Sequence, residues 1–277
     1  MNPFAYDFFV RALWGALLTG LVTGIIGSYI AVRRMVFIAG GITHSSFAGL
    51  GFGFMTGISP VLCAMVSAVL AGIGVDFLVQ KGREREDSAI AALWSLGMAL
   101  GVVFLFLTPG YAPSLSAFLF GNILLVGPFD LGALSLFALL SISGVILFYR
   151  KLLYFSFDPD FARARGLGVR LWSLLMMVWF SVGIVLSIRV MGIMMLMSML
   201  SLPQMTVNLF TSDFRKLLIG SALLSLLVVL AALFLSFYLN LPTGALSVIL
   251  LSLVFLFSKA IRALRKPSVS PSEGTEG

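Results

Sequence analysis

The chain is short of charge, histidine and cysteine. Of its 277 residues only 10% are charged and 60% are hydrophobic, whereas a soluble domain has about 25% charged residues. It carries one histidine, His44, and one cysteine, Cys63, which cannot form an intrachain disulfide. A soluble enzyme, a nucleic-acid-binding domain and a disulfide-stapled secreted module are therefore excluded. A protein built into the lipid bilayer is expected instead.

Catalytic motifs are missing as well. A single histidine rules out HExxH and any cage of several histidines within one chain. The sequence has no GxSxG nucleophile elbow and no GxxxxGK[ST] phosphate loop. Asp76 is the only acidic residue clearly inside an apolar run, so an intramembrane aspartate pair is absent. We predict that the chain is not an enzyme and holds no permanent cofactor.

Long continuous apolar runs predict an all-α, polytopic membrane helix bundle. An outer-membrane barrel would show strands of about ten residues with alternating polarity. The length predicts about nine transmembrane helices, with eight or ten as alternatives. The expected spans are roughly Phe8–Val32, Met35–Met55, Pro60–Val79, Ala89–Leu107, Phe129–Phe148, Leu171–Ile188, Val190–Phe210, Leu217–Leu239 and Thr243–Ile261.

The basic residues orient these spans, because cytoplasmic loops of membrane proteins are rich in Lys and Arg. With Arg33 and Arg34 in the cytoplasm and one crossing per run, 16 of the 18 Lys and Arg residues fall on the cytoplasmic side. Only Arg11 and Arg189 fall outside. We therefore expect a multi-pass protein of a prokaryotic plasma or inner membrane, with its N-terminus outside and its C-terminus in the cytoplasm.

Three parts of the chain complete this organisation. Residues 1–266 form the predicted transmembrane domain, and the small polar residues of 267–277 predict a disordered cytoplasmic tail. A short non-crossing helix is expected around Ser114–Leu125 on the outer side. Glycine pairs four residues apart let helix backbones approach closely in lipid, and we expect packing within the bundle, with a homodimer contact as the alternative. These pairs are Gly20–Gly24, Gly49–Gly53, Gly53–Gly57 and Gly97–Gly101.

The cytoplasmic segment 157–170 reads FDPDFARARGLGVR. Asp158 is a good N-cap, because its carboxylate accepts hydrogen bonds from free backbone N–H groups. Pro159 suits the first helical position, and Gly166 or Gly168 suits a left-handed C-cap. A two-turn helix that is capped at both ends is predicted on the cytoplasmic surface. Such a helix is suited to inserting into a groove on a partner, and the alternative is a simple interfacial helix.

His44 is the first candidate for a functional group inside the membrane. A histidine at that depth is costly unless it is partnered or faces water. It could therefore lie on a transport pathway, or be a neutral side chain hydrogen-bonded to a neighbouring helix. The hydroxyls placed to help it bind an ion belong to Thr43, Ser45 and Ser46.

The run MGIMMLMSMLSLPQMTVNLF is the second candidate. Pro203 should kink the helix, and Ser201, Gln204 and Asn208 follow at helical spacing on one face. Such a face could line an aqueous path or bond other helices. Methionine thioethers are soft metal ligands, but these do not share one face, and gap filling is the expected use. They are Met191, Met194, Met195, Met197 and Met199.

With these segments in view, the sequence resembles the permease subunit of ABC transporters for zinc, manganese and related divalent metals, the family often called ABC-3. The order and spacing of several segments carry the resemblance over nearly the whole chain. They are GSYIAVRRMVFIAGGITHSSFAG at Gly27–Gly49, EDSAIAALWSLGMALG at Glu86–Gly101, LTPGY at Leu107–Tyr111, LFGNIL at Leu119–Leu124, DPDFARARGLGV at Asp158–Val169 and LSFYLNLPTGALSV at Leu235–Val248.

The resemblance implies a type II ABC importer-like fold and a homodimer of this chain bound to two cytoplasmic ATPase subunits. It also implies an extracytoplasmic metal-binding protein that delivers zinc, manganese or iron as cargo. Lipid is the remaining partner, and nucleic acid is not one. The segment 157–170 would couple the ATPases to the spans through Asp158, Pro159, Asp160, Phe161, Ala162, Arg163, Arg165 and Gly166.

One position departs from the family pattern. The family commonly has an aspartate four residues before the histidine of the second helix, and the pair would ligate the ion near the two-fold axis. His44 stands at the histidine position, but the aspartate is replaced by Gly40. His44, paired across the dimer, remains the metal-ligand candidate. The alternatives are an ABC permease for a metal chelate or another small nutrient, and a stand-alone secondary transporter or channel.

Overall fold

The computed structural model describes residues 5–82, 85–109, 121, 123 and 126–265. Within these residues the protein is all-helical and has no strand. The predicted outer helix around Ser114–Leu125 and the tail 267–277 lie largely or wholly outside them. The helices are α1 (Asp7–Val32), α2 (Val36–Thr56), α3 (Pro60–Gly82), α4 (Glu86–Phe106), α6 (Pro128–Phe157), α7 (Pro159–Ala164), α8 (Val169–Met191), α9 (Ile193–Met199), α10 (Leu202–Asn208), α11 (Phe214–Leu239) and α12 (Thr243–Arg265).

Six of the described helices, namely α1, α4, α6, α8, α11 and α12, are long and apolar enough to cross a membrane. In α3 the described apolar stretch is shorter, Pro60–Val75. The prediction of an all-α membrane bundle is confirmed. Each expected span corresponds to one helix, except that Val190–Phe210 covers the last residues of α8, the short helices α9 and α10 and the turn after them. The number of crossings and the direction of insertion remain predictions.

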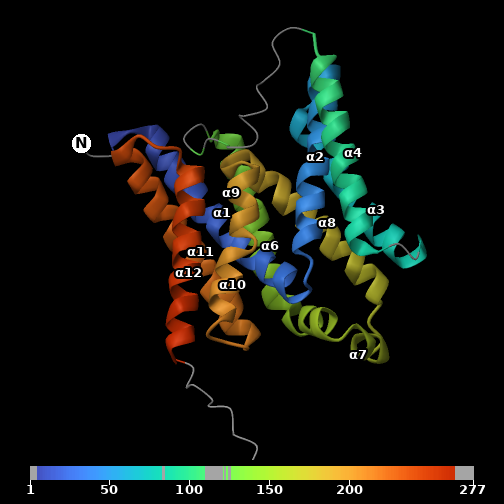
Figure 1. Cartoon of the computed structure of the whole chain (residues 1–277). Helices are drawn as coiled ribbons and strands as arrows, with labels where there is room; N and C mark the ends of the chain where they lie inside the picture. Colours follow the sequence, from blue (N-terminus) through green and yellow to red (C-terminus); the bar gives the residue numbers. More distant parts are fainter. Residues whose placement is uncertain (1–4, 83–84, 110–120, 122, 124–125, 266–277) are drawn as a thin grey trace, which may run out of the picture.

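Contacts between helix ends show that the long helices run between two ends of the bundle (Figure 1). At one end, Phe9 near the start of α1 packs against Phe234 and Phe237 near the end of α11. At the other end, Tyr29 near the end of α1 packs against Phe214 at the start of α11. The short helix α7 and the last turn of α12 lie at this second end, at the bottom of Figure 1.

Each end of the bundle also has an arginine held by an interaction with a neighbouring helix. At the end that carries α7, the Arg33 guanidinium donates to the Phe155 carbonyl at 2.9 Å. At the opposite end, Arg189 of α8 forms an ion pair with Asp130 of α6, with a shortest N–O distance of 3.0 Å. Arg189 is one of the two basic residues that fell outside the predicted cytoplasmic set. Its charge is therefore balanced by a carboxylate on the neighbouring helix.

Local chemistry explains where several helices begin and end. Gly57 ends α2 with a φ of 74°, a left-handed conformation that glycine adopts without steric cost. Asp213 caps α11 by accepting hydrogen bonds from the backbone N–H groups of Arg215 and Lys216. Asn240 ends α11 in the left-handed region, and Pro242 follows directly before α12.

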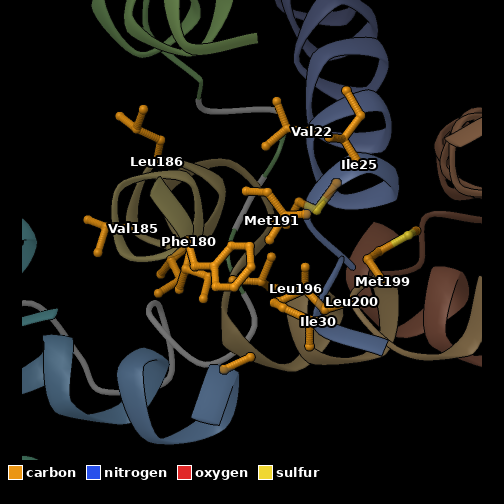
Figure 2. Packing of buried hydrophobic residues seen from close by; sticks show 14 of the residues in the cluster. Val22, Ile25, Ile30, Phe180, Val185, Leu186, Met191, Leu196, Met199 and Leu200 are labelled. Carbon is orange, nitrogen blue, oxygen red and sulfur yellow. The ribbon is translucent and has the colours of Figure 1, made fainter. Parts of the chain in front are cut away.

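One part of the buried core lies where α1, α8 and α9 meet. Figure 2 shows Val22, Ile25 and Ile30 of α1 facing side chains of α8 and of the α9 segment. Because lipid tails are as apolar as these side chains, close packing rather than escape from water holds helices together in a bilayer. The close fit of buried side chains therefore determines how these helices pack. Those labelled from α8, from α9 and from the residue after α9 are Phe180, Val185, Leu186, Met191, Leu196, Met199 and Leu200.

The glycine pairs serve packing within the chain. A Cβ on Gly20 would stand 2.9 Å from the Leu226 Cα of α11, and one on Gly24 would overlap Ala222 of the same helix. Gly49 and Gly53 face the α3 backbone in the same way. The expected intramolecular use is thus confirmed for these pairs. In the pair Gly53–Gly57, by contrast, Gly57 faces open space.

Candidate functional site

His44 lies on α2 against α4, and it is half-buried. Its imidazole stacks on the indole of Trp94, with ring centroids 4.1 Å apart and planes 13° apart. Its Nδ1 lies 3.4 Å from the Sδ of Met98. Trp94 and Met98 are one helical turn apart on α4, so both reach the same side of α2. The histidine is therefore held between an aromatic face and a thioether.

Gly40 lies one turn before His44, and the space beside it is filled. A Cβ at this position would stand 3.1 Å from Cζ3 of Trp94 and 3.1 Å from the Cε methyl of Met197. Any side chain at this position would require Trp94 or the Met197 methyl to shift by a few tenths of an ångström. The ring of Trp94 and the methyl group of Met197 thus lie beside the position at which the family pattern has a carboxylate.

The hydroxyls near His44 are bonded to the backbone. Thr43 donates to the Ala39 carbonyl at 2.7 Å and Ser46 to the Thr43 carbonyl at 2.6 Å. Ser45 donates to the Leu93 carbonyl of α4 at 3.0 Å. These three side chains fasten α2 to itself and to α4. Their proposed contribution to an ion pathway remains a prediction.

The polar atom that contacts the imidazole of His44 is the thioether sulfur of Met98. Among the residues that the structure describes, no group of three or more His, Cys, Asp or Glu side chains is placed to hold a metal ion. The sequence reasoning missed Trp94 and Met98. Their four-residue spacing in ALWSLGMALG puts them on one helix face, which is the signal that could have found them.

The second candidate, around Pro203, is a break between two helices. Where the sequence predicted a kink, the helix is interrupted just before this proline: α9 ends at Met199 and α10 begins at Leu202, with Pro203 in its first turn. Pro203 has no N–H to offer the Met199 carbonyl. The side-chain amide of Gln204 donates to that carbonyl at 3.4 Å and to the Thr23 carbonyl of α1 at 3.3 Å.

The break changes the polar face expected there. Ser201 lies between the two helices, where its hydroxyl donates to the Met197 carbonyl at 3.0 Å. Gln204 is fully buried, whereas Asn208 is exposed. The expectation that these three side chains share one continuous helix face is therefore wrong, because the helix is interrupted at the first of them. Their place on a transport path stays a prediction.

Helix α7 is capped at both ends, as the sequence predicts. The Asp158 carboxylate accepts from the Phe161 N–H at 2.8 Å, and Pro159 is the first helical residue. After the helix, Gly166 takes a φ of 77°. The Gly166 and Leu167 N–H groups bond back to the Arg163 and Ala162 carbonyls at 3.0 Å each. These bonds close the C-terminus with a left-handed cap.

The surface of α7 is mostly exposed, and only Ala162 is fully buried. Asp160 and Arg163 form an exposed ion pair at 2.9 Å. The Phe161 ring lies against the Tyr154 ring of α6. The Arg165 guanidinium lies over the Phe161 ring, with its Cζ 5.1 Å from the ring centroid. The helix thus offers a small surface of mixed charge with an aromatic centre.

A cavity of about 770 Å³ opens beside α7. It is bounded by α7, the start of α8 and the junction between α1 and α2. Three arginines of its lining, Arg33, Arg163 and Arg170, make it basic. This end of the bundle therefore carries a hollow with a basic lining.

Comparison with known proteins decides the family. The family described as the ABC 3 transport family matches residues 5–262. The chain belongs to this family. It is a membrane permease component, not an enzyme, and a multi-pass protein of the cell membrane, as the sequence predicted.

Two relatives and one solved structure illustrate the membership in the ABC 3 transport family. A probable metal transport system membrane protein of Chlamydia pneumoniae is 34% identical, over 96% of this chain and 93% of its own length. The manganese transport system membrane protein MntC of Listeria monocytogenes is 30% identical, over 91% of this chain and 90% of its own length. The structure of PsaBC from Streptococcus pneumoniae in complex with Fab aligns with a TM-score of 0.82 and 26% identity, over 91% of both chains.

Proposed function

We propose that this chain is the membrane-spanning permease subunit of an ABC importer for a metal ion. It works as a homodimer, is driven by two separate cytoplasmic ATPase subunits, and receives its cargo from an extracytoplasmic metal-binding protein. The family match over residues 5–262 carries this proposal. Relatives named as metal and manganese transport membrane proteins, matched over at least nine-tenths of this chain, support it.

Coupling to ATP hydrolysis would occur at α7. A helix of two turns is marginal by itself, so the caps at Asp158 and Gly166 are needed to keep it formed. Its fixed shape lets it act as a rigid lever when the ATPases close. The chain has no phosphate loop of its own, which agrees with ATP hydrolysis on another subunit. The basic cavity beside α7 would give the ATPase subunit a second contact surface.

The cargo would pass close to His44. In the homodimer, the two-fold axis would bring the two copies of this histidine close together. The cargo we expect is a divalent zinc, manganese or iron ion. A transport site has to bind weakly enough to release its ion, and a site with few ligands satisfies this need. Thr43, Ser45 and Ser46 are further candidates for lining this path.

Reconstitution tests the proposal. Liposomes carrying the chain alone and liposomes carrying the chain with its ATPase and binding protein would be loaded with a metal-sensitive dye. We expect ATP-dependent metal uptake only with the full set. Gradient-driven metal flux by the chain alone would support a secondary transporter or channel. ATP-dependent uptake of a chelate but not of the free ion would support a chelate permease.

A further inference from the structure

A groove of about 650 Å³ lies between the last third of α6 and the start of α11, at the end of the bundle that carries α7. Its lining combines well-exposed apolar side chains with exposed basic ones. On both helices the basic residues stand closer to this end of the bundle than the apolar ones do. The apolar side chains are Ile146, Leu147 and Ile219, and the basic ones are Arg150, Lys151 and Arg215.

The length of α6 indicates the depth of this groove in a bilayer. A helix that begins at Pro128 rises by about 30 Å before it reaches Phe148, and the hydrocarbon core of a bilayer has about this thickness. The helix bends at that point, because Phe148 has a non-helical φ of −109° and ψ of 15°. The apolar side chains of the groove therefore lie at the level of the acyl chains, and the three basic ones lie at the level of the lipid headgroups.

Carboxylates do not neutralise the basic side chains of this groove. Within the part of the chain that the structure describes, none of the three forms an ion pair, and no acidic residue lines the groove. The Arg215 Cζ lies 5.1 Å from the centroid of the Tyr149 ring, and the Lys151 Nζ lies 5.6 Å from that of the Phe148 ring. Aromatic faces hold a cation in place without cancelling its charge. The groove therefore keeps its positive charge for an anion.

The combination of charge and depth selects one kind of occupant. A soluble anion would gain nothing from the exposed apolar side chains, and a cytoplasmic protein would not reach them at the level of the acyl chains. A second copy of this chain, docked groove to groove, would place the same basic residues opposite each other, and opposed like charges weaken association. A phospholipid with a negatively charged headgroup matches both parts of the lining.

We propose that the groove between α6 and α11 binds an anionic phospholipid. The headgroup phosphate lies among Arg150, Lys151 and Arg215, and an acyl chain runs along the apolar side chains. Guanidinium groups bind phosphate oxygens through paired hydrogen bonds, and basic pockets between membrane helices suit anionic headgroups. No residue of α2 lines the groove, so the lipid site is separate from His44 and does not depend on which ion is carried.

Lipid titrations test the proposal on the full chain, purified in mild detergent with whatever subunits stay bound to it. The probes are dioctanoyl phosphatidylglycerol, dioctanoyl phosphatidylcholine and inorganic phosphate, and bound lipid is counted by native mass spectrometry. The two lipids share their acyl chains and differ in net charge. The test variant is Lys151→Gln/Arg215→Gln. The matched control, Lys259→Gln/Arg262→Gln, removes two exposed cations near the end of α12.

We expect saturable binding of phosphatidylglycerol that weakens by about tenfold in the test variant and is unchanged in the control, with much weaker binding of phosphatidylcholine. Equal affinity for the two lipids, which needs no variant to measure, or equal binding in the two variants would overturn the lipid site. Displacement of the lipid by inorganic phosphate at similar concentration would assign the basic residues to a soluble anion. Loss of the dimer in the test variant alone would assign the groove to a second copy. Either of these results also overturns the proposal.

Discussion

The imidazole of His44 lies flat against the indole of Trp94, with ring centroids 4.1 Å apart and planes inclined by only 13°. The same indole stands 3.1 Å from the point where a side chain on Gly40 would begin. One aromatic residue of α4 therefore orients the histidine and fills the place of the family's aspartate. These two roles are linked, because a side chain at position 40 would require the indole that stacks on His44 to shift by a few tenths of an ångström.

Enlarging position 40 should therefore be costly. We expect Gly40→Leu to lower the stability of the chain by about 1–3 kcal/mol, as overpacking does in a filled interior. Gly132→Leu on α6 is the control, since no atom lies within 4 Å of a Cβ there, and it should cause no loss. Thermal unfolding in detergent measures both. A Gly40→Leu variant as stable as the control would contradict the filled site.

Gln204 should stabilise the break between α9 and α10. Gln204→Leu removes the amide that bonds the Met199 and Thr23 carbonyls, and we expect a loss of about 1–3 kcal/mol. Asn208→Leu, an exposed change on the same helix, should cost little. Adding Pro203→Ala should recover part of the loss, because alanine supplies a backbone N–H. Unfolding curves that do not distinguish Gln204→Leu from Asn208→Leu would refute this role.

The ion pair of Asp130 and Arg189 should tie α6 to α8. Its side chains are 15% and 39% exposed, respectively, whereas those of Asp160 and Arg163 on α7 are 88% and 69% exposed. A double-mutant cycle should give a coupling of about 0.5–1 kcal/mol for the first pair and nearly none for the second. Equal coupling in the two pairs, or none in either, would show that partial burial does not strengthen the first.

The cap of α7 should matter for the ATPase. Asp158→Ala removes the acceptor for the Phe161 N–H, a loss of about 1 kcal/mol of helix stability, and we expect weaker ATPase binding and slower uptake. Asp213→Ala uncaps α11 by the same chemistry and should leave ATPase affinity unchanged. A titration of detergent-solubilised chain with the ATPase measures this. If both variants bind the ATPase equally well, α7 is not the element on which the ATPase docks.

Features fixed by neighbours along the chain could be predicted from the sequence. The caps at Asp158 and Gly166 and the break at Pro203 depend only on residues within one or two turns. The apolar runs predicted the helices for the same reason, since each run is long enough to form a span by itself.

Features that depend on which helices meet could not be predicted. The stacking of Trp94 on His44 requires α4 to lie against α2, as Gly97 and Ser45 allow by their close contact. Nothing in the local pattern of either segment states that pairing. The polar face around Ser201 failed for a related reason, because its helical spacing assumed an unbroken helix through the proline.

Co-purification from the native membrane shows whether this chain works together with ATPase subunits. The tagged chain would be isolated in mild detergent, its partners identified and their copy numbers counted. We predict one ATPase subunit per copy of this chain, and loss of the ATPase when residues 158–168 are replaced by a Gly/Ser linker of equal length. A chain that emerges alone, and stays alone after crosslinking, would contradict the coupling of this chain to an ATPase.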